Sequence, residues 1–440
     1  MAGRGLILAA PASGSGKTLI TAGLLRHLSC RGTCVAAAKA GPDYIDPTFH
    51  AAASGRPCVN LDLWAMRPAT LAGLVAELEI CASLVLCEGV MGLFDGTGLD
   101  GEAGSTAALA RLTGWPVVLV VDARRQGASA AALIGGFARH DPQLPLAGVI
   151  FNRVAGPRHR ALLETALACH VPGVPCLGAI PQDPALELAE RHLGLVPAGE
   201  RVEAETVIEH AATAVSAALD INALLALARP SNLSGASPVI SLPPLGQQIA
   251  VARDEAFVFA YHMVLEGWRR AGSSLSFFSP VADEPPDPDA DAVYLPGGYP
   301  ELHAGRLAMA ERFFSGLRRA VHAGTSIYGE CGGYMVLGEA LTDAEGQAHR
   351  MAGLLPLATG FAERRLQLGY RSLTLLQDGP LGLRGFHFRG HEFHYATTLS
   401  AGGEALFTAA DSSGTDLGSV GLRRGSVAGS FIHLIDREED

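Results

Sequence analysis

Short apolar runs alternate with longer alanine-rich stretches along the first half of the chain. The runs lack the polar alternation of a half-exposed strand, and such runs predict strands that are buried on both faces. The alanine-rich stretches between them have the length of helices, as does the segment 17–28. Strands that alternate with helices predict a parallel sheet with helices on both faces. The expected strands are residues 5–10, 33–38, 84–87, 117–121, 147–151 and 176–180.

A stretch rich in proline, serine and glycine interrupts this pattern at residues 229–246. Its composition is typical of an interdomain linker. Beyond it the alternation starts again, which predicts a second α/β domain. We therefore expect an N-terminal domain over residues 1–228 and a C-terminal domain over residues 247–440. In the second domain, the expected strands are residues 249–252, 275–278, 292–295 and 325–328, and the expected helices are residues 257–271 and 302–322.

The composition narrows the class of protein. Of the 440 residues, 48% are hydrophobic and 18% are charged, which excludes a disordered chain. The longest apolar stretch, residues 115–121, is far shorter than the ~20 residues that cross a membrane. Residues 1–10 carry a single basic residue, unlike a secretory signal, so we expect a cytoplasmic location. The eight cysteines form no C-x-x-C pair, which predicts reduced thiols, and the net charge of −11 does not suit a nucleic acid. We expect no membrane and no nucleic acid as partners.

A glycine-rich loop, PASGSGKT, lies between the first expected strand and the first expected helix. In this context backbone amides and a helix N-terminus cradle phosphate groups. Lys17 would supply a positive charge to the terminal phosphates, and Thr18 would offer its hydroxyl to Mg²⁺. The alternative is a turn without a ligand, and Pro11 stands where the strict pattern has glycine. The expected ATP-binding residues of this loop are Ser13, Gly14, Ser15, Gly16, Lys17 and Thr18.

Lys39, the second of only two lysines, and several acids follow neighbouring expected strands. The carboxyl ends of parallel strands share one edge of a sheet with the phosphate loop, so these side chains can converge there. Asp43 and Glu88 are expected Mg²⁺ ligands beside Thr18, because a hard cation takes oxygen ligands. For any single acid the alternative is a helix cap or a solvated turn. The converging set is Lys39, Asp43, Glu88 and Asp95.

A second candidate site is the segment YGECGGYM, in which Cys331 stands between glycines. It follows an expected strand and precedes an expected helix at residues 334–339. Glycine neighbours permit the sharp turn that lifts a nucleophile clear of its strand, and the helix dipole is expected to lower the pKa of the thiol. The alternative, a buried structural thiol, is favoured for the other seven cysteines.

Other segments would supply the remaining parts of a thiol-dependent site. Gly298, in LPGGYP, is expected to donate its amide to an oxyanion. His433, in GSFIHL, is the expected base, in preference to His391 and His394. Together with His387, the last two could suggest a metal site, but on one strand residue 394 faces away from residues 387 and 391. We expect packing or substrate contacts for these three histidines.

These segments together resemble the corrinoid glutamine amidotransferases along essentially the full chain. APASGSGKT, KAGPDYIDPTFH and CEGVMGLFDG resemble the dethiobiotin-synthetase-like branch of P-loop proteins. LPGGYPE, YGECGGYMVLG and GSFIHL resemble a triad-type, or class I, glutamine amidotransferase domain. Within the family, the chain is most similar to the enzymes that act on cobyrinic and hydrogenobyrinic acid. The resemblance implies a P-loop domain with a doubly wound parallel sheet, followed by a class I amidotransferase α/β domain.

The resemblance also implies an activity and its site residues. The activity is an ATP- and glutamine-dependent ligase reaction of cobalamin biosynthesis. It amidates the a and c side-chain carboxylates of hydrogenobyrinic or cobyrinic acid through a phosphorylated carboxylate. The implied cofactors are ATP and Mg²⁺, and the implied partners are glutamine and a polycarboxylate tetrapyrrole. The oligomeric state stays open, with a homodimer as one option. Cys331 is implied as the glutaminase nucleophile and His433 as its activator. The remaining implied residues are Lys39 and Asn152 for ATP, and Asp43, Tyr44, Glu88 and Asp95 for the metal and the tetrapyrrole.

Some alternatives stay open. Ordinary members of the class carry a glutamate two residues after the histidine, where this chain has Ile435, so the group that orients His433 is open, with Glu392 as one candidate. Nickel-sirohydrochlorin a,c-diamide synthase and cobyric acid synthase use the same machinery on related macrocycles. A function of another class is a P-loop switch ATPase with a non-catalytic amidotransferase-like module. A decayed module has no reason to keep the thiol, its glycines and the histidine together, which disfavours the switch. The cationic partners expected for the substrate acids are Arg124, Arg125 and Arg153.

Overall fold

The computed structural model describes residues 3–98, 101–186, 190–191, 194–195, 202–235 and 239–438. The chain divides into two compact units. The first comprises Met1–Trp64 and Leu71–Ser237, and the second comprises Ala65–Thr70 and Pro238–Asp440. The predicted linker contains the last of the three boundaries between the units, between residues 237 and 238, and residues 236–238 lie outside the described residues. Each unit has its own sheets and its own candidate site.

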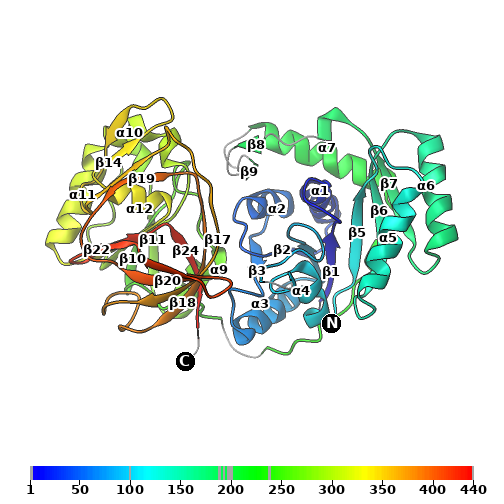
Figure 1. Cartoon of the computed structure of the whole chain (residues 1–440), viewed down its shortest axis with the longest axis horizontal. Coiled ribbons are helices and arrows are strands. Elements are labelled where there is room, and N and C mark those ends of the chain that lie inside the picture. The colour runs from blue at the N-terminus through cyan, green and yellow to red at the C-terminus, as the bar shows by residue number, and fades with distance from the viewer. Residues whose placement is uncertain are drawn as a thin grey trace. The chain divides into compact units, whose positions relative to one another are not determined.

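The first unit is built on a seven-stranded sheet with the order β3-β2-β4-β1-β5-β6-β7 (Figure 1). Every pair of neighbouring strands is parallel. The strands are buried along most of their length. Strand β5, with the sequence VVLVVD, is typical, since β-branched side chains favour a strand that is covered on both faces. The strands are β1 (Arg4–Ala9), β2 (Val35–Ala40), β3 (Cys58–Leu61), β4 (Leu84–Glu88), β5 (Val117–Asp122), β6 (Leu146–Val154) and β7 (Cys176–Pro181).

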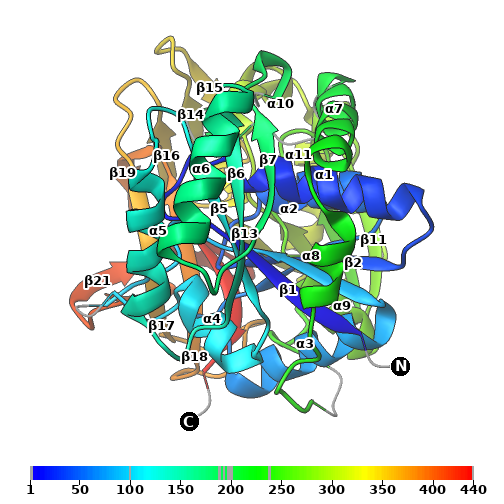
Figure 2. The same ribbon diagram turned by 90° about the vertical axis from the view of Figure 1, so that its right-hand side faces the viewer.

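Helices cover both faces of this sheet. Right-handed crossovers place α1 and α2 on one face and α3 to α6 on the other. Helix α7 packs against α1 and α2, and α5 and α6 lie side by side at the β5–β7 end (Figure 2). The helices are α1 (Lys17–Cys30), α2 (Asp46–Ser54), α3 (Pro68–Cys81), α4 (Thr106–Thr113), α5 (Ser129–His140), α6 (Pro157–His170), α7 (Val202–Ala218) and α8 (Ile221–Leu227). After β7 come the 3₁₀ turn η1 (Pro184–Leu186) and a small sheet of β8 (Glu190–Arg191) and β9 (Gly194–Leu195).

The strand order brings the expected site residues to one edge. Strand β4 lies between β2 and β1, and its register pairs Glu88 with Lys39 on one side and with Leu8 on the other. The phosphate loop follows directly after β1, at the same edge. The doubly wound parallel sheet predicted from the apolar runs is therefore present. The short strand β3 escaped the sequence analysis because its four residues, CVNL, do not form an uninterrupted apolar run.

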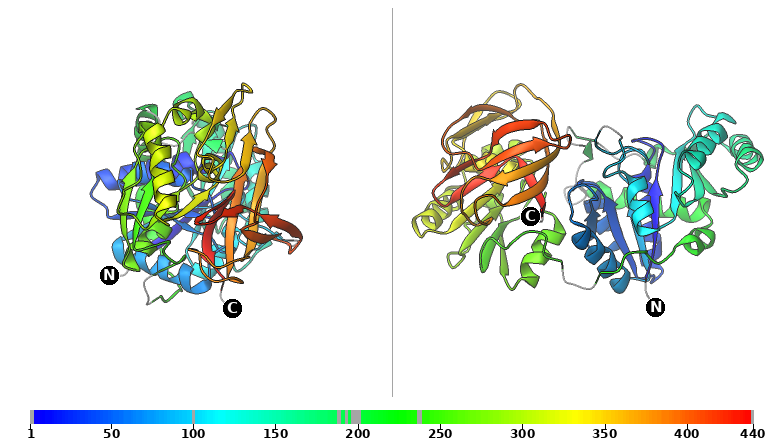
Figure 3. Two further views of the ribbon diagram at one scale, coloured as in Figure 1. Left: turned by 90° about the vertical axis from the view of Figure 1, so that its left-hand side faces the viewer. Right: turned by 60° about the horizontal axis from the view of Figure 1, so that its bottom comes forward.

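The second unit contains three sheets in its described residues. The first has the order β11-β10-β12-β13-β23-β22, parallel except for the β22–β23 pair. The second, drawn in orange to red in Figure 3, is antiparallel with the order β21-β20-β17-β18-β24. The third has the order β15-β14-β16-β19. The strands are β10 (Gln248–Ala252), β11 (Ser274–Phe278), β12 (Ala292–Leu295), β13 (Ser326–Glu330), β14 (Ala340–Thr342), β15 (Ala348–Arg350), β16 (Leu357–Gly360), β17 (Gln367–Leu375), β18 (His387–His394), β19 (Thr397–Ala401), β20 (Phe407–Asp411), β21 (Asp416–Val420), β22 (Leu422–Arg424), β23 (Val427–Ser430) and β24 (Ile432–Arg437).

The first predicted helix of the second unit, residues 257–271, is shorter in the structure. Helix α9 (His262–Arg270) begins later because the segment before it pairs with another loop. Phe259 forms an antiparallel bridge with Gly297, and its amide donates to the Gly297 carbonyl at 3.0 Å. This tertiary pairing holds the loop that contains Gly297 and Gly298. The other helices are α10 (Ala304–Ala308), α11 (Glu311–His322) and α12 (Gly332–Leu337), with 3₁₀ turns η3 (Pro280–Ala282) and η4 (Pro300–Leu302).

The second predicted helix, residues 302–322, is broken into η4, α10 and α11. The break before α11 has a local cause. Ala310 has φ −79° and ψ 72°, outside the helical region, and the carboxylate of Asp283 accepts a hydrogen bond from the Phe313 amide at 2.9 Å. A carboxylate at this position caps the first turn of a helix. The apolar pattern continues across the break, so it did not reveal it.

One residue joins two sheets of the second unit. Strand β23 ends at Ser430 in the parallel sheet, and β24 begins at Ile432 in the antiparallel sheet. The Ser430 hydroxyl accepts a hydrogen bond from the Ile432 amide at 3.2 Å, which supports the sharp passage at Phe431. His433 therefore stands directly beyond this junction. None of the helices in the described residues combines the length and hydrophobicity that crossing a membrane needs.

Candidate active sites

The phosphate loop has the backbone conformation that its glycines permit. Gly14 and Gly16 have φ values of 75° and 91°, which residues with a side chain rarely adopt. A Cβ added at Gly16 would also lie 2.3 Å from the Nδ2 atom of Asn152. That Nδ2 atom donates a hydrogen bond to the Ser15 carbonyl at 2.9 Å. Asn152, near the end of β6, thus supports the loop through this hydrogen bond. Ser13 and Gly14, at the tip of the loop, are exposed.

The two lysines lie in different surroundings at this edge. Lys17, the first residue of α1, donates from Nζ to the Met91 carbonyl at 2.7 Å, and burial lowers its pKa. Lys39 is buried between two acids, with its Nζ 2.6 Å from Asp46 Oδ2 and 3.2 Å from Glu88 Oε1. Burial alone would lower the pKa of Lys39, but the two carboxylates raise it above its usual value. Lys39 therefore stays charged and is held by its two acids, whereas the hydrogen bond of Lys17 goes to a backbone carbonyl.

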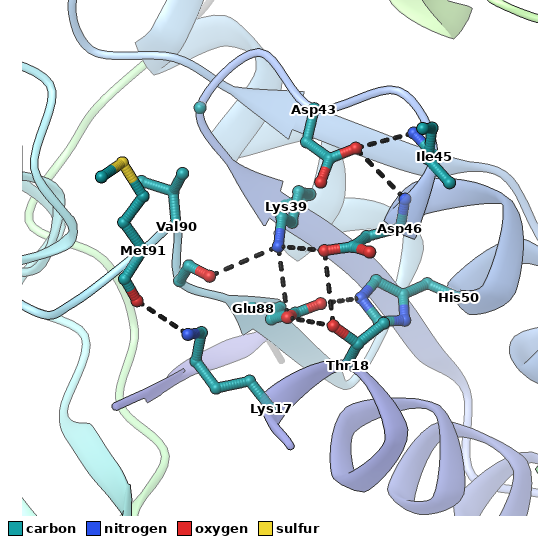
Figure 4. A network of polar contacts seen from close by, with 12 residues as sticks. Lys17, Thr18, Lys39, Asp43, Ile45, Asp46, His50, Glu88, Val90 and Met91 are labelled. Atoms are coloured by element: carbon teal, nitrogen blue, oxygen red, sulfur yellow. Dashed lines mark hydrogen bonds and ion pairs between the residues drawn. The ribbon is translucent and has the colours of Figure 1, made fainter. Parts of the chain in front are cut away.

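Glu88 is the centre of a polar network in the first unit (Figure 4). The Thr18 hydroxyl donates to its Oε1 atom at 2.8 Å, and the His50 Nε2 atom lies 2.5 Å from its Oε2 atom. Burial alone would raise the pKa of Glu88, but Lys39 and His50 hold it well below its usual value. Asp46 completes the group, because its Oδ2 atom lies 3.4 Å from the Thr18 hydroxyl. Glu88 is thus a carboxylate at neutral pH, beside the hydroxyl of the phosphate loop.

The other expected acids make contacts of a different kind. The Asp43 Oδ1 atom accepts hydrogen bonds from the amides of Ile45 at 2.7 Å and Asp46 at 3.2 Å, in the turn that leads into α2. Burial and the nearby Asp46 raise the pKa of Asp43 to about 7. The Asp95 Oδ2 atom accepts from the Gly92 amide at 2.9 Å, and Tyr44 is buried in the loop before α2. All three lie in the loops at this edge, as expected.

The sequence analysis missed Asp46 and His50. Both lie in the segment KAGPDYIDPTFH, and they are four residues apart on α2, so they share one face of the helix. That spacing was the available signal. It became informative only once the register placed Glu88 opposite this face. His50 is completely buried, and its contact with Glu88 orients the carboxylate toward Thr18.

The residues at this edge suit a magnesium ion in part. The Thr18 hydroxyl and the carboxylates of Glu88 and Asp46 are oxygen donors, which Mg²⁺ prefers. Across the described residues, no group of three or more His, Cys, Asp or Glu side chains is arranged to hold a metal by itself. This fits an ion that takes its remaining ligands from phosphate oxygens and water, as Mg²⁺ usually does in nucleotide sites.

The three expected arginines lie near the phosphate loop. Arg153 follows Asn152 and has an unusual φ of 58°; its NH1 atom donates to the Gly14 carbonyl at 2.6 Å and to Asp122 Oδ2 at 2.7 Å. Arg124 also pairs with Asp122, at 2.8 Å. Arg125 is exposed and has a φ of 61°. The contact of Arg153 with the loop links β5 and β6 to the phosphate-binding segment.

In the second unit, Cys331 occupies a strained turn between β13 and α12. Its φ of 48° and ψ of −105° lie outside the regions that residues with a side chain favour. Tight packing around the turn leaves no room for larger neighbours: a Cβ at Gly333 would lie 2.0 Å from the Leu295 carbonyl oxygen. Strain of this kind persists only where the surroundings enforce it, and it is typical of functional residues. The sharp turn predicted for Cys331 is present.

The side chains of Cys331 and His433, the expected nucleophile and base, both lie next to Gly297. A Cβ added at Gly297 would lie 2.3 Å from Cε1 and 3.0 Å from Nε2 of His433, and 3.1 Å from the Cβ of Cys331. The Nε2 edge of the imidazole and the side chain of Cys331 therefore face the same small space. The structure brings together residues that lie about a hundred positions apart in the sequence, and it leaves room for them because residue 297 has no side chain.

Burial sets the protonation of this pair. Cys331 is 1% exposed, and burial raises the pKa of its thiol well above the usual value, although the Gly332 amide opposes this shift. The sequence analysis predicted a lowered pKa; that prediction is wrong, because burial outweighs the short helix that follows. Burial also lowers the pKa of His433 to about 3, with His391 and His394 adding to the effect. The resting pair is a thiol beside a neutral imidazole, which can accept the proton of the thiol.

The amide of Gly298, the residue expected from the sequence to be the oxyanion donor, lies close to the turn after the nucleophile. A Cβ added at Gly332, directly after the nucleophile, would lie 3.0 Å from the Gly298 amide nitrogen. The amide is therefore adjacent to the turn that carries Cys331. A Cβ at Gly298 itself would lie 2.0 Å from the Ala256 carbonyl oxygen, so only glycine fits here.

The other histidines lie on β18 beside the expected base. His391 is the partner of His433 across the β18–β24 pair, and burial lowers its pKa to about 4. His394 stacks on Phe431, with ring centroids 4.0 Å apart. Glu392, the candidate for orienting His433, instead contacts His394 at 3.1 Å and Arg371 at 2.7 Å. It alternates with His391 along the strand, so it faces the opposite side of the sheet.

Comparisons with known proteins agree with these two sites. Residues 6–196 match the CobQ/CobB/MinD/ParA nucleotide binding domain, and residues 248–440 match the CobB/CobQ-like glutamine amidotransferase domain. The chain is 54% identical to the hydrogenobyrinate a,c-diamide synthase of Brucella anthropi, over 98% of both chains. It is 53% identical to that of Rhizobium meliloti, over 99% of this chain and 100% of the relative. The relative from Rhodobacter capsulatus is 53% identical over 98% of both chains.

These matches confirm the predicted fold class, with a P-loop domain before a glutamine amidotransferase domain, and the predicted class of enzyme, a glutamine-dependent ligase of cobalamin biosynthesis. At this identity over nearly the whole length, the chain belongs to the hydrogenobyrinate a,c-diamide synthase family.

Proposed function

We propose that this chain uses ATP and glutamine to convert the a and c carboxylates of hydrogenobyrinic or cobyrinic acid into amides. The observation that carries the proposal is the meeting of Cys331 and His433 at Gly297 in a chain that also holds the Thr18–Glu88 pair beside a phosphate loop. The first arrangement suits the release of ammonia from glutamine. The second suits the activation of a carboxylate.

The two halves of the reaction need each other. Ammonia cannot displace oxide from a carboxylate, so an oxygen of the acid first attacks the terminal phosphorus of ATP, and ADP leaves. Ammonia then attacks the acyl carbon, and inorganic phosphate leaves with that oxygen. Because ammonia is mostly protonated at neutral pH, its release from glutamine by a thiol supplies the reactive form. An enzyme of this kind therefore requires both a nucleotide site and a thiol site.

In the first unit, we assign nucleotide binding to the loop and its neighbours. The amides of Ser13, Gly14, Ser15 and Gly16 would bind phosphate oxygens, with Lys17 turning from the Met91 carbonyl to the terminal phosphates. Lys39 and Asn152 remain in the proposed ATP-binding set. Asn152 supports the loop through the Ser15 carbonyl, and its role at the adenine rests on the family resemblance.

The proposed metal is Mg²⁺, held by Thr18 and Glu88, with Asp43 as the third ligand expected from the sequence. Asp46 is a stronger candidate for that third position, because its carboxylate lies beside the Thr18 hydroxyl whereas Asp43 accepts two amides. When bound, the ion would offset negative charge on the phosphates. Tyr44 and Asp95 remain proposed tetrapyrrole contacts, on the loops around this edge.

In the second unit, we assign Cys331 as the nucleophile, His433 as the base and Gly298 as the oxyanion donor. His433 takes the thiol proton at Nε2, and the sulfur attacks the side-chain carbonyl carbon of glutamine. The same proton then goes to the leaving ammonia, and water hydrolyses the glutamyl thioester. The Gly298 amide would stabilise the oxygen that becomes negative during each addition. A cytoplasmic location and a homodimer complete the proposal as expectations from the sequence.

The test separates the two sites in one purified protein. Cys331→Ala should lose amidation with glutamine and keep it with ammonium salts, while Lys17→Ala should lose both. Cys169→Ser, at an exposed cysteine, is the matched control. Glutamine use by Cys331→Ala at the wild-type rate would contradict the assignment of the thiol.

A second measurement tests the reaction and its substrate. Oxygen-18 in the substrate carboxylates should appear in inorganic phosphate, and the product of hydrogenobyrinic or cobyrinic acid should show the mass change of two amidations. Amidation of nickel-sirohydrochlorin or of the cobyric acid precursor alone would assign a related family activity. ATP hydrolysis without any dependence on macrocycle or glutamine would indicate a switch ATPase instead.

A further inference from the structure

The usual source of the acid that orients the histidine is absent from β24. Ile435 stands two residues after His433, at the position where triad-type domains carry glutamate, and it is completely buried. Residues two apart on a strand face the same side, so this side of β24 presents an apolar group. Any acid that faces His433 must therefore come from another element.

A buried carboxylate from the neighbouring sheet takes this place. Glu330 is the last residue of β13, directly before the nucleophile, and it is 3% exposed. Its Oε2 atom lies 3.9 Å from Nδ1 of His433, which is itself 0% exposed. The Nε2 edge of the same imidazole faces Gly297 and Cys331. The ring thus lies between Glu330 on one side and the thiol on the other.

Two hydrogen bonds fix the carboxylate in this position. The Tyr294 hydroxyl, from β12, donates to Oε2 at 2.7 Å. The amide of Leu434, the residue after His433, donates to Oε1 at 3.1 Å. The second bond ties Glu330 to the strand that carries the histidine, although β13 and β24 belong to different sheets. The carboxylate is therefore held against the backbone next to the imidazole that it faces.

We propose that Glu330 is the positioning residue for His433, replacing the acid that Ile435 cannot supply. This inference rests on the proposed glutaminase role of Cys331. A hydrogen bond from Nδ1–H to Glu330 holds the tautomer in which Nε2 is free to accept the thiol proton. When the imidazolium forms, the carboxylate faces the new charge. The 3.9 Å separation shortens to a hydrogen bond in the glutamine complex, as catalytic contacts commonly do on substrate binding.

The groups around Glu330 shift the pKa of its carboxyl group. Burial raises its pKa to about 7, while the hydrogen bonds from Tyr294 and the Leu434 amide act in the other direction. The pKa values of Tyr294 and Tyr328 are raised by burial and by Glu330, so both stay protonated. Other titratable groups near the pair are Cys331, His391, His394 and Tyr261, whose ring centroid lies 6.5 Å from that of His433. Ionised Glu330 should therefore accumulate as the pH rises through about 7.

The test variant is Glu330→Gln. A glutamine can keep both anchoring contacts, since its carbonyl accepts from the Leu434 amide and its amide lies opposite the Tyr294 hydroxyl, but it carries no negative charge. We expect glutamine hydrolysis to lose roughly 10²–10⁴-fold in kcat, with KM for glutamine within about twofold, by analogy with base and triad-acid substitutions. Amidation with ammonium salts should keep the wild-type rate, which shows that the chain is folded. Glu345→Gln, at an exposed turn, is the matched control.

Two further readouts separate positioning from a structural role. The wild-type kcat for glutamine hydrolysis should rise through about pH 7, and Glu330→Gln should lack this rise. Nitrogen-15 signals of His433 should show the Nδ1–H tautomer in the wild type and a mixture of tautomers in the variant. Glu392→Gln examines the rival acid.

Three outcomes would overturn the proposal: wild-type kcat and pH profile in Glu330→Gln, equal loss of the ammonium-dependent rate in that variant, or a loss found in Glu392→Gln instead. If the wild-type chain hydrolyses no glutamine at all, the proposed function fails as well, so the two failures are distinguishable.

Discussion

His50 and Glu88 form a completely buried pair, in which Nε2 of the imidazole lies 2.5 Å from Oε2 of the carboxylate. The other oxygen of Glu88 accepts from the Thr18 hydroxyl at 2.8 Å. The imidazole therefore fixes the direction in which Glu88 faces the phosphate loop. A residue that the sequence analysis did not single out thus controls the geometry of one that it did.

Replacing His50 should weaken both stability and nucleotide chemistry. In His50→Leu, a buried carboxylate oxygen loses its partner, which should cost about 1–3 kcal/mol of unfolding free energy. The amidation rate should fall with glutamine and with ammonium alike, because the affected site phosphorylates the carboxylate, a step that precedes the attack by ammonia from either source. Denaturant unfolding and the two rate assays check this, with the exposed His170→Leu as control. A variant with an unchanged ATP-dependent rate would show that Glu88 needs no orientation.

Asp46 and Asp43 should respond differently to removal of their charge. Asp46→Asn should raise the Mg²⁺ concentration needed for half-maximal activity, because the Asp46 carboxylate lies 3.4 Å from the Thr18 hydroxyl. Asp43→Asn keeps an oxygen that can accept the Ile45 and Asp46 amides, so this variant should leave both the stability and the magnesium requirement close to those of the wild type. Magnesium titrations of the ammonium-dependent rate measure the first effect. A larger magnesium effect in Asp43→Asn would restore the ligand set expected from the sequence.

A methyl group at Gly297 should disable the thiol site alone. In Gly297→Ala, the new Cβ would lie 2.3 Å from Cε1 of His433, so the imidazole must move away from Cys331. We expect a loss of roughly 10²-fold or more in glutamine-dependent rate, as for the loss of a general base, and no change with ammonium. Gly402→Ala, where nothing lies within 4 Å of an added Cβ, is the control. Equal rates in the two variants would place His433 outside the reaction.

His433 should make the protein less stable as the pH falls. Its pKa is about 3 in the folded chain, against the usual 6.5 of a histidine in an unfolded chain, so between these values the unfolded chain binds more protons. Stability therefore decreases from about pH 6.5 down to about pH 3, by up to roughly 5 kcal/mol for a group of this kind. Unfolding free energies of wild type and His433→Gln should converge or cross as the pH is lowered. Parallel curves would show that the imidazole is not buried in its neutral form.

The sequence predicted correctly those features that depend on residues close together along the chain. The phosphate loop and the turn at Cys331 are local, since glycine, lysine and threonine act there within a few residues of one another. Apolar runs also predicted the parallel strands. In the antiparallel sheet, β17, β20 and β21 are partly exposed, and their weaker pattern gave no prediction.

Contacts between distant segments could not be predicted in this way. Asp46 and His50 can be recognised as site residues only from the strand register, which places Glu88 opposite α2. Glu330 and His433 lie on strands of different sheets, so no spacing along the chain relates them. The raised pKa of Cys331 depends on how completely the fold covers the sulfur, which a motif does not reveal.

The passage at Phe431 has a consequence for the thiol site. Between Ser430, at the end of β23, and His433, on β24, the chain has just two residues. Because strand residues alternate between faces, inserting or deleting a single amino acid there would rotate the imidazole to the far side and bring Ile432 or Leu434 in its place. The number of residues between Ser430 and His433 should therefore matter to the thiol site as much as the histidine itself.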